Sequence, residues 1–399
     1  MSIPLSSTPA ATPPRLSPDT GVVLVVTALF VTLPLLIAGA VSPRQAVLFL
    51  IGGLMGAALY HGAFGFTGGW RRMVQERRGR AMRAQMLMVA AATVVFIPVL
   101  GGLVPEVRAV GALAPVGVSV LVGAAMFGLG MQLGGGCGSG TLFTVGGGSA
   151  RMLLTLAFFC IGALAGSAHL PWWLTLPSIG TVDLGKTLGV PGAILATLAF
   201  LGAVAAVTAV IERREHGALE RVPSPPRRGL ARLVHGPWPL VGVGLALAGL
   251  NIATLFVAGH PWSVTYGFGL WAAKAADALG AGVAEWPFWA AGGNARALNA
   301  SVLQDVTSVM NFGIILGAAL AAALAGRFAP RAALPWGSAL AAVVGGLLMG
   351  YGARLSFGCN IGALFSGIAS GSLHGWLWFG AAFCGSLVGI RARRLFGME

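Results

Sequence analysis

The chain has 399 residues, of which 56% are hydrophobic and only 9% are charged, and its formal net charge is +14. Soluble domains carry about 25% charged residues, so this composition excludes an ordinary soluble protein. The apolar runs are about 20 residues long, which predicts membrane-spanning helices and excludes a barrel of short alternating strands. The arginines gather between these runs, as the positive-inside rule expects, so the basic charge does not indicate a nucleic-acid partner.

The first part of the chain is expected to contain a disordered segment, residues 1–20, and a first membrane half, residues 21–211. The apolar runs of this half are 22–41, a shorter segment 46–60, then 85–104, 110–133, 152–169 and 192–211. The loop 71–83 is rich in arginine, whereas 171–189 is nearly uncharged. By the arginine bias, the first of these loops is expected in the cytoplasm and the second in the periplasm.

Residues 212–236 are expected to form a cytoplasmic linker, because they are rich in arginine and proline. The second membrane half, residues 237–399, has apolar runs at 240–257, 302–325, 334–351 and 373–390. Two other stretches of this half, 263–276 and 281–299, are interrupted by glycine or proline. We therefore predict an all-α polytopic membrane protein with about nine full spans and additional short, broken helices.

One segment of the first half recurs in the second half. GLGMQLGGGCGSGTLF at 128–143 returns 222 residues later as GYGARLSFGCNIGALF at 350–365, with eight identities in sixteen positions. The arginine bias predicts that the helix before the first copy runs inward and the helix before the second copy runs outward. The sequence therefore predicts two inverted repeats whose glycine-rich segments meet near the bilayer midplane at a binding site.

Cys137 and Cys359 occupy the same position in the two copies and are the main candidate site residues. We expect each to lie at the start of a short half-helix, because Ser139 and Asn360 are residue types that favour the N-cap position. The free N–H groups at such a helix start attract an anion. A neutral thiol is a soft donor that suits an anionic sulfur atom. The glycines that flank the two cysteines and complete this candidate site are Gly136, Gly138 and Gly358.

Other residues are weaker candidates. Arg354 stands where the first copy has Gln132, and it would either attract anions into the path or extend to the membrane interface. Lys274 and Asp277 are three residues apart and could form an ion pair. Three polar candidates for the wall of a cavity are Asn294, Asp305 and Asn311. The remaining cysteines, expected to pack as ordinary core residues, are Cys160 and Cys384.

The segments GGGCGSGTL at 134–142 and FGCNIGALFSG at 357–367 resemble the paired motifs of the YeeE/YedE family of sulfur-transport membrane proteins, and the resemblance extends from about residue 45 onward. It implies thiosulfate import through an hourglass-shaped helical fold with thiols along a central path, and Cys137 and Cys359 match the two principal cysteines. Family members often carry a third cysteine after a Gly-Phe pair. This chain has Thr67 there, which leaves a related sulfur or selenium species open as the substrate.

We therefore expect a multi-pass transporter of the bacterial inner membrane, not an enzyme, that takes up thiosulfate or a closely related sulfur-containing ion. A separate small cytoplasmic sulfur-carrier protein is a candidate partner, and neither a cofactor nor a metal is expected, because no zinc-type cysteine pair occurs. The alternative from another class is a membrane sulfurtransferase with a cysteine persulfide. It would require a base near the thiol, and neither motif contains His or Lys.

Overall fold

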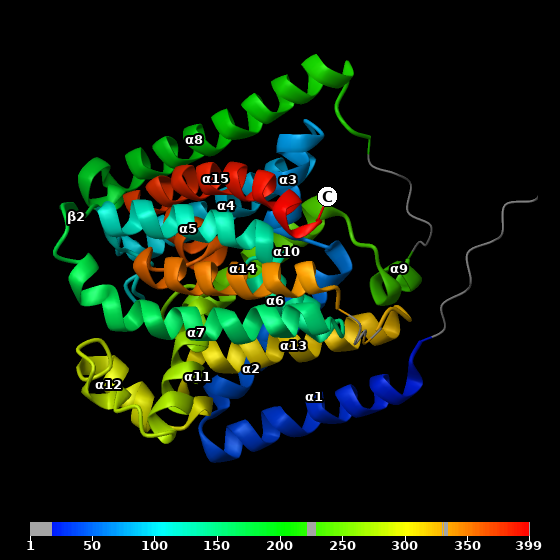
Figure 1. The fold of residues 1–399 in the computed structure, drawn as a ribbon. Helices are drawn as coiled ribbons and strands as arrows, with labels where there is room; N and C mark the ends of the chain where they lie inside the picture. Colours follow the sequence, from blue (N-terminus) through cyan, green and yellow to red (C-terminus); the bar gives the residue numbers. More distant parts are fainter. Residues whose placement is uncertain (1–17, 222–228, 329, 331–333, 399) are drawn as a thin grey trace, which may run out of the picture.

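The structure is a computed structural model that describes residues 18–221, 229–328, 330 and 334–398, and most of its long helices run side by side (Figure 1). Ten helical segments in these ranges are long and apolar enough to cross a membrane. The prediction of a helical, polytopic membrane protein is confirmed. The expected disordered N-terminal segment falls mainly on residues 1–17, outside the described residues, as does part of the expected linker, 222–228.

The first half of the chain contains eight helices and two short strands in the described ranges. The helices are α1 (Thr20–Ala40), α2 (Pro43–Gly62), α3 (Phe66–Gln75), α4 (Arg80–Leu100), α5 (Val118–Gly134), α6 (Gly138–Gly146), α7 (Ala150–Trp173) and α8 (Leu184–His216). The strands β1 (Pro115–Gly117) and β2 (Ser178–Thr181) pair in antiparallel fashion. Side chains cap several helices at their starts: Asp19 accepts from Val22 N, and Ser42 accepts from Gln45 N.

The second half has a similar order of long and short helices. They are α9 (Leu230–His235), α10 (Leu240–Ala258), α11 (Thr265–Ala278), η1 (Val283–Glu285), α12 (Gly292–Asn299), η2 (Val302–Gln304), α13 (Val306–Leu324), α14 (Trp336–Leu355), η3 (Asn360–Gly367), α15 (Leu373–Ala392) and η4 (Arg393–Phe396). η3 is a π-helix and η1, η2 and η4 are 3₁₀-helices. A π-helical turn is rare and is often found at a functional site.

The structure corrects three of the expected boundaries. The segment 46–60 belongs to the full 20-residue helix α2, which adds a span to the nine expected. Residues 110–117 are not helical: 110–114 have no regular secondary structure, 115–117 form β1, which pairs with β2, and α5 begins only at Val118. The expected loop 171–189 is shorter, since α8 already begins at Leu184 and is interrupted at Gly189, where φ is 69°.

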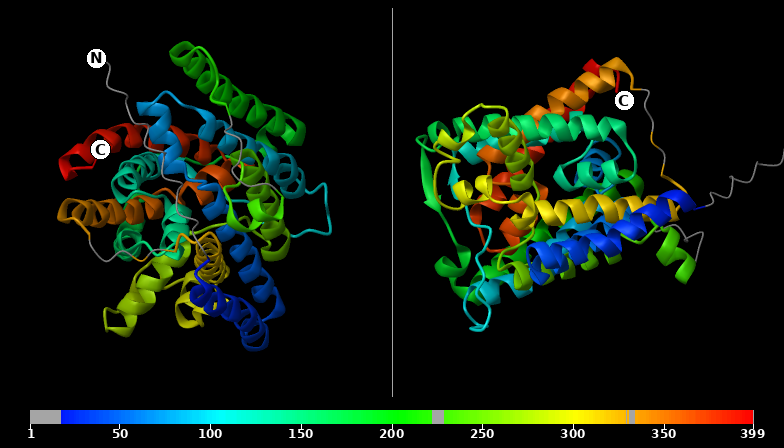
Figure 2. Two further views of the ribbon diagram at one scale, coloured as in Figure 1. Left: turned by 90° about the vertical axis from the view of Figure 1, so that its right-hand side faces the viewer. Right: turned by 90° about the horizontal axis from the view of Figure 1, so that it is seen from below.

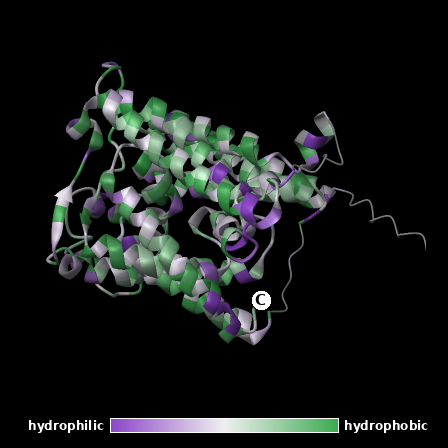
Figure 3. Cartoon of the chain, turned by 90° about the horizontal axis from the view of Figure 1, so that it is seen from above, coloured by the Kyte–Doolittle hydropathy of each residue, from purple (hydrophilic) through white to green (hydrophobic). Residues whose placement is uncertain are grey.

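The two ends of the bundle differ in charge. The C-terminus, α9 and the end of α8 lie at the right in Figure 1, whereas β2 and α12 lie at the left. The described chain begins and ends on the same side of the bundle, as Figures 1 and 2 show together. We call this side the arginine-rich end, defined by the arginines of 71–83, 213–221 and 391–394. Between the ends, the long helices are hydrophobic over most of their length (Figure 3).

The helices of the two halves are packed into each other. α5 contacts α14 and α15, and α14 also contacts α7, while α2 packs against α13 and α4 packs against α8 and α10. The short helices α6 and η3 lie within this arrangement, and every residue of η3 is buried. The outer helices α1 and α8 are mostly exposed and carry uncovered leucines such as Leu35 and Leu195, as expected of helices that face lipid.

Candidate translocation site

Four helices begin in the buried centre of the bundle: α3, α6, α11 and η3. The backbone is extended at Cys137, with ψ −169°, and at Cys359, with ψ −165°, so these cysteines are themselves the N-caps of α6 and η3. The expectation that Ser139 and Asn360 would be the N-caps is therefore wrong, because helical geometry already begins before or at these residues. Cys137 is 1% exposed and Cys359 is 0% exposed, so both residues are buried.

The two cysteines, 222 positions apart in sequence, meet around one glycine. A Cβ atom added to Gly138, the residue after Cys137, would lie 3.2 Å from Cys359 Sγ and 3.4 Å from Thr265 Cγ2. A Cβ atom added to Gly140 would lie 3.4 Å from Cys137 Sγ. Both cysteines are free. The fold thus brings both predicted thiols into one narrow, buried region.

Hydrogen-bond donors surround the thiols. Ile361 N donates to Cys359 Sγ over 3.4 Å, and Ser139 Oγ lies 3.6 Å from Cys137 Sγ. The amide groups of Phe66 and Gly140 also face the Cys137 sulfur. These donors come from the starts of three different helices, where N–H groups have no partner within the helix. The site therefore presents N–H, O–H and S–H groups, which suit an anion.

The turn before each cysteine has the same left-handed backbone in the two copies. Gly135 has φ 89°, and its counterpart Phe357 has φ 56°, which is unusual for a residue with a side chain. The following glycine leaves room for the first turn of the short helix. A Cβ atom on Gly136 would lie 3.2 Å from Thr141 N, and one on Gly358 would lie 2.6 Å from Ala363 N. The predicted glycines are therefore required by close backbone approach.

Several buried polar side-chain atoms in and beside the thiol region have no partner among the described residues. Within the described ranges, no hydrogen bond reaches Thr67 Oγ1, Gln132 Oε1 or either amide atom of Asn360. Gln132 Nε2 donates to Thr67 O over 3.2 Å, so these two residues are neighbours. Because buried polar groups are nearly always paired, these atoms are candidates for contact with a passing ion or water. Sequence reasoning did not select Gln132; its alignment with Arg354 was the available signal.

Arg354 lies on the other side of the thiols, in a cavity of about 350 Å³ that we call the Arg354 cavity. Gly358 and Thr265 also line it, so the cavity extends to residues that adjoin Cys359 and Gly138. The guanidinium carbon is 4.5 Å from the centre of the Phe288 ring, which favours a cation. No acceptor in the described part of the chain reaches Nε or Nη2. Arg354 thus lines a cavity that adjoins the residues around Cys359, and its role in attracting anions stays a prediction.

The family assignment comes from a sequence comparison that covers most of the chain. The sequence model of the family described as "Sulphur transport" matches residues 61–388. The chain belongs to the sulphur-transport family. This result confirms the resemblance carried by the two cysteine motifs.

This sulphur-transport protein is similar in sequence to several bacterial transporters. The thiosulfate transporter TsuA of Spirochaeta thermophila is 30% identical over 284 residues, which cover 65% of this chain and 73% of that protein. The thiosulfate transporter TsuA of Escherichia coli is 27% identical over 343 residues, covering 84% and 90% of the two chains. The probable transporter YedE of the same organism is 30% identical over a shorter stretch of 155 residues, covering 37% and 38%.

The expected ion pair between Lys274 and Asp277 of this sulphur-transport protein is not formed. Lys274 Nζ donates instead to Leu298 O over 2.6 Å and to Ala300 O over 2.5 Å, so it satisfies carbonyl groups at the end of α12. Asp277 accepts from Ala284 N over 3.1 Å. Free carbonyl groups at a helix end are good partners for a long cationic side chain, which explains the difference.

The other polar candidates have mixed positions. Asp305 caps α13, accepting from Ser308 N over 2.7 Å, and burial raises the pKa of its carboxyl group. Asn294 lines the Arg354 cavity and accepts from Tyr266 OH over 3.0 Å. Asn311 donates to Val264 O over 2.9 Å and thereby positions the turn beside Gly138. The last two adjoin the candidate site, whereas Asp305 lines a different cavity of about 470 Å³, which Asn294 also lines.

The remaining two cysteines lie apart from the site. Cys160 is half-buried and packs against the main core cluster, as expected. Cys384 is exposed on α15, so the expectation that it packs in the core is wrong. A thiol on a lipid-facing helix surface is chemically acceptable because it behaves as a small hydrophobic group. The pair therefore provides natural controls for the buried pair.

Proposed function

We propose that this protein takes up thiosulfate, or a closely related sulfur-containing ion, across the bacterial inner membrane. The observation that carries the proposal is the meeting of Cys137 and Cys359 around Gly138, at the starts of buried helices and beside the Arg354 cavity. The names of the TsuA relatives support thiosulfate as the substrate class. No step in this proposal forms or breaks a covalent bond.

The path attracts an anion without holding it tightly. Arg354 supplies a full positive charge at one mouth, and each helix start supplies roughly half a charge. Two facing helix starts, α6 and η3, neutralise a dianion only in part, so the ion remains free to move on. Weak successive sites of this kind favour conduction over capture. We infer that the ion passes from the Arg354 cavity to Cys359, and from there to Cys137.

The two thiols give the path its preference for sulfur. The outer sulfur of thiosulfate is large, polarisable and weakly hydrated, so a neutral S–H donor meets it without adding negative charge. Beyond Cys137 the path reaches Thr67, whose hydroxyl stands where related proteins often carry a third thiol. We propose that this chain uses two thiols and one hydroxyl, with Gln132 beside the hydroxyl. Thr67 Oγ1 has no partner in the described chain, which leaves it available to an ion.

Reciprocal packing of aligned glycines supports the proposal of two inverted repeats, 21–211 and 237–399. A Cβ atom on Gly130 would lie 2.8 Å from Gly345 O, and one on Gly352 would crowd Gly123 O. Gly130 aligns with Gly352, and Gly345 aligns with Gly123, so replacing each glycine of the first contact by its aligned counterpart gives the second contact. Such exchange is typical of a two-fold axis. An axis in the membrane plane would give the hourglass-like path expected from the sequence.

The charge difference between the two ends supports the orientation. The arginine-rich end contains the loop 71–83 and the C-terminal arginines, so the positive-inside rule places it in the cytoplasm. The Arg354 cavity then faces the periplasm, where thiosulfate would enter. With ten spans, both ends of the described chain lie on the same side, as Figure 1 also shows.

Uptake of labelled thiosulfate by cells that lack other importers tests the proposal. Cells that produce this protein should accumulate the label, and unlabelled thiosulfate should compete at a much lower concentration than sulfate does. Selenite, as a second competitor, tests the related-substrate alternative. Uptake of sulfate in preference to thiosulfate would contradict the proposal, as would accumulation no faster than in cells without the protein.

A further inference from the structure

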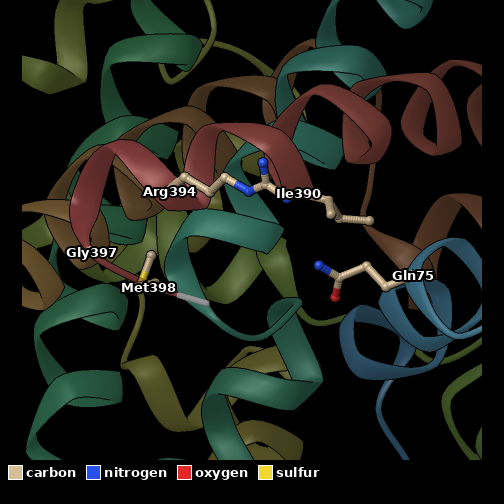
Figure 4. A pocket seen from close by; sticks show the side chains of 5 residues that line it. All are labelled: Gln75, Ile390, Arg394, Gly397 and Met398. Carbon is tan, nitrogen blue, oxygen red and sulfur yellow. The ribbon is translucent and has the colours of Figure 1, made fainter.

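A second cavity lies at the arginine-rich end and contains none of the predicted site residues. Its volume is about 540 Å³, and its lining comes from the end of α3 and from the C-terminal part of the chain. The lining residues are Gln75, Ile390, Arg394, Gly397 and Met398 (Figure 4). We call it the Arg394 cavity. Figure 4 shows the polar ends of Gln75 and Arg394 extending into the same space from different elements.

The charge around this cavity is positive and is not neutralised by the described carboxylates. Arg71, Arg151 and Arg393 lie close enough to influence one another electrostatically. The described ion pairs instead join Glu76, Glu212 and Glu220 to other arginines, namely Arg72, Arg78, Arg80 and Arg83. Within the described residues, the side chain of Arg394 forms neither a hydrogen bond nor an ion pair. A concave site lined by charge of one sign concentrates ions of the opposite sign.

Arg151, a second arginine near the cavity, already donates to backbone carbonyl groups. Arg394 is therefore the cationic side chain that lines the cavity. Arg151 donates to Leu133 O over 2.6 Å and to Gly134 O over 2.7 Å, at the end of α5. It also contacts Met398 Sδ over 3.5 Å, and this contact places the C-terminal segment against the same helix end. Met398, which lines the cavity, therefore lies close to the end of α5, three residues before Cys137.

Polar contacts connect this cavity with the thiol region. Arg393, which precedes the cavity residue Arg394, donates to Gln132 O over 3.0 Å. Gln132 in turn donates to Thr67 O, and the amide of Phe66, the preceding residue, faces the Cys137 sulfur. An anion that leaves Cys137 past Thr67 would thus reach a region of positive charge. This continuity favours a free anion over a lipid headgroup as the occupant.

We propose that the Arg394 cavity is a second anion site, which binds a small divalent oxyanion such as thiosulfate on its release side. The inference rests on the proposed function for the direction of travel but not for the binding itself. Arg394 supplies the charge, Gln75 donates to an oxygen atom from the opposite wall, and the nearby arginines lower the energy of a dianion. The same chemistry would suit the phosphate of an anionic lipid, which the test below distinguishes.

Isothermal titration of the purified full chain with thiosulfate tests the site. An Arg354→Gln background removes the other cavity's cation, so the binding that remains reports mainly on the Arg394 cavity. Adding Arg394→Gln should weaken that binding by at least about tenfold, the loss expected for a charged hydrogen-bond partner. Adding Arg391→Gln should leave it unchanged, because Arg391 belongs to α15, does not line the cavity and donates to Leu387 O.

A second variant keeps the test decisive if Arg394→Gln fails to fold, as judged by gel filtration and thermal unfolding. Gln75→Leu changes the cavity from α3 and should weaken binding about threefold or more. Unchanged affinity in folded Arg394→Gln or Gln75→Leu protein would overturn the inference. Complete displacement of thiosulfate by phosphatidylglycerol in the detergent micelle, at equal charge concentration, would assign the site to lipid and also overturn it.

The two proposals can fail separately. If wild-type cells do not import thiosulfate but Arg394-dependent binding is measured, the proposed function is wrong and the site remains. If wild-type cells import thiosulfate and Arg394→Gln binds it normally, the proposed function remains and the site is wrong. Sulfate as a second titrant should bind the Arg394 cavity nearly as well as thiosulfate, because no thiol lies in its lining.

Discussion

Gly138 lies where one added methyl group would obstruct the proposed path most directly. In Gly138→Ala the Cβ atom would lie 3.2 Å from Cys359 Sγ and within 3.4 Å of Val264 Cγ1. Overpacking of this kind costs about 1–3 kcal/mol, so we expect thiosulfate uptake to fall at least about fivefold while the protein still reaches the membrane. Gly202→Ala on α8 is the matched control, since no atom lies within 4 Å of that Cβ position. Normal uptake by the Gly138 variant would show that the ion does not pass between the thiols.

A substitution at one of the two cysteines tests whether the proposed path requires a thiol. Serine has nearly the shape of cysteine but is a harder, more strongly hydrated donor, so Cys359→Ser should lose most thiosulfate uptake. A net difference of about 1 kcal/mol at this site already changes occupancy by about fivefold. The measurement is uptake by the variant beside competition by sulfate in the wild type. A fully active serine variant together with equal competition by sulfate would indicate a general anion path.

Individual site residues were predictable from sequence where the repeat marked them. Cys137 aligns with Cys359 and Gly136 aligns with Gly358, and the structure brings the two cysteines together. The capping role could not be predicted, because helix starts depend on the backbone angles at the cysteines and not on residue preference. Asn360 illustrates this: its type favours an N-cap, yet it lies inside η3 with both amide atoms unpartnered in the described chain.

Among the helices, the pairing of α5 with α15 and of α14 with α7 depends on glycines that the repeat also preserves. A Cβ atom on Gly128 would overlap Ala382 O, and one on the aligned Gly350 would overlap Phe159 O. We expect Gly128→Ala and Gly350→Ala each to lower the free energy of unfolding by about 1–3 kcal/mol. Thermal unfolding in detergent measures this, and Gly380→Ala on α15, with open space at its Cβ position, is the control. Equal melting temperatures for all three variants would contradict the proposed helix contacts.

Most helices were predictable because an apolar run of about 20 residues has few alternatives in a membrane. The predicted helix boundaries were wrong, or short helices were missed, where the length of the apolar run does not determine the secondary structure. Residues 110–117 are apolar but not helical: 110–114 have no regular secondary structure, and 115–117 form β1, for which β2 supplies a partner. The short helices α6, α11 and η3 are too short to be detected by hydropathy, and only the glycine-rich motifs indicated them.

For the whole molecule, the central prediction from sequence is orientation, and it can be tested by labelling from outside intact cells. Single cysteines placed at exposed positions of the two ends, Ile179→Cys in β2 and Glu215→Cys near the end of α8, should differ. An impermeant maleimide should label the first and leave the second unlabelled until the membrane is opened. The reverse pattern would place the arginine-rich end outside and contradict the proposed direction of uptake.

The molecule as a whole was more predictable in its parts than in their contacts. Composition gave the membrane class, and the repeat indicated that residues 128–143 and 350–365 act together. The sequence could not show that η3 is a π-helix, that Arg354 faces aromatic rings, or that a basic cavity forms from the C-terminal residues and α3. These features depend on contacts between segments far apart in the chain, which no local pattern encodes.

Uptake of labelled thiosulfate into liposomes that contain the purified protein tests the account most directly, because no other importer is present. The comparison is between wild type, the double variant Cys137→Ala, Cys359→Ala, and the control double variant Cys160→Ala, Cys384→Ala. Wild type and the control should take up thiosulfate at similar rates, and the variant without the two buried thiols should show no uptake above protein-free liposomes. Wild-type uptake by the Cys137→Ala, Cys359→Ala protein would contradict a path through the thiols.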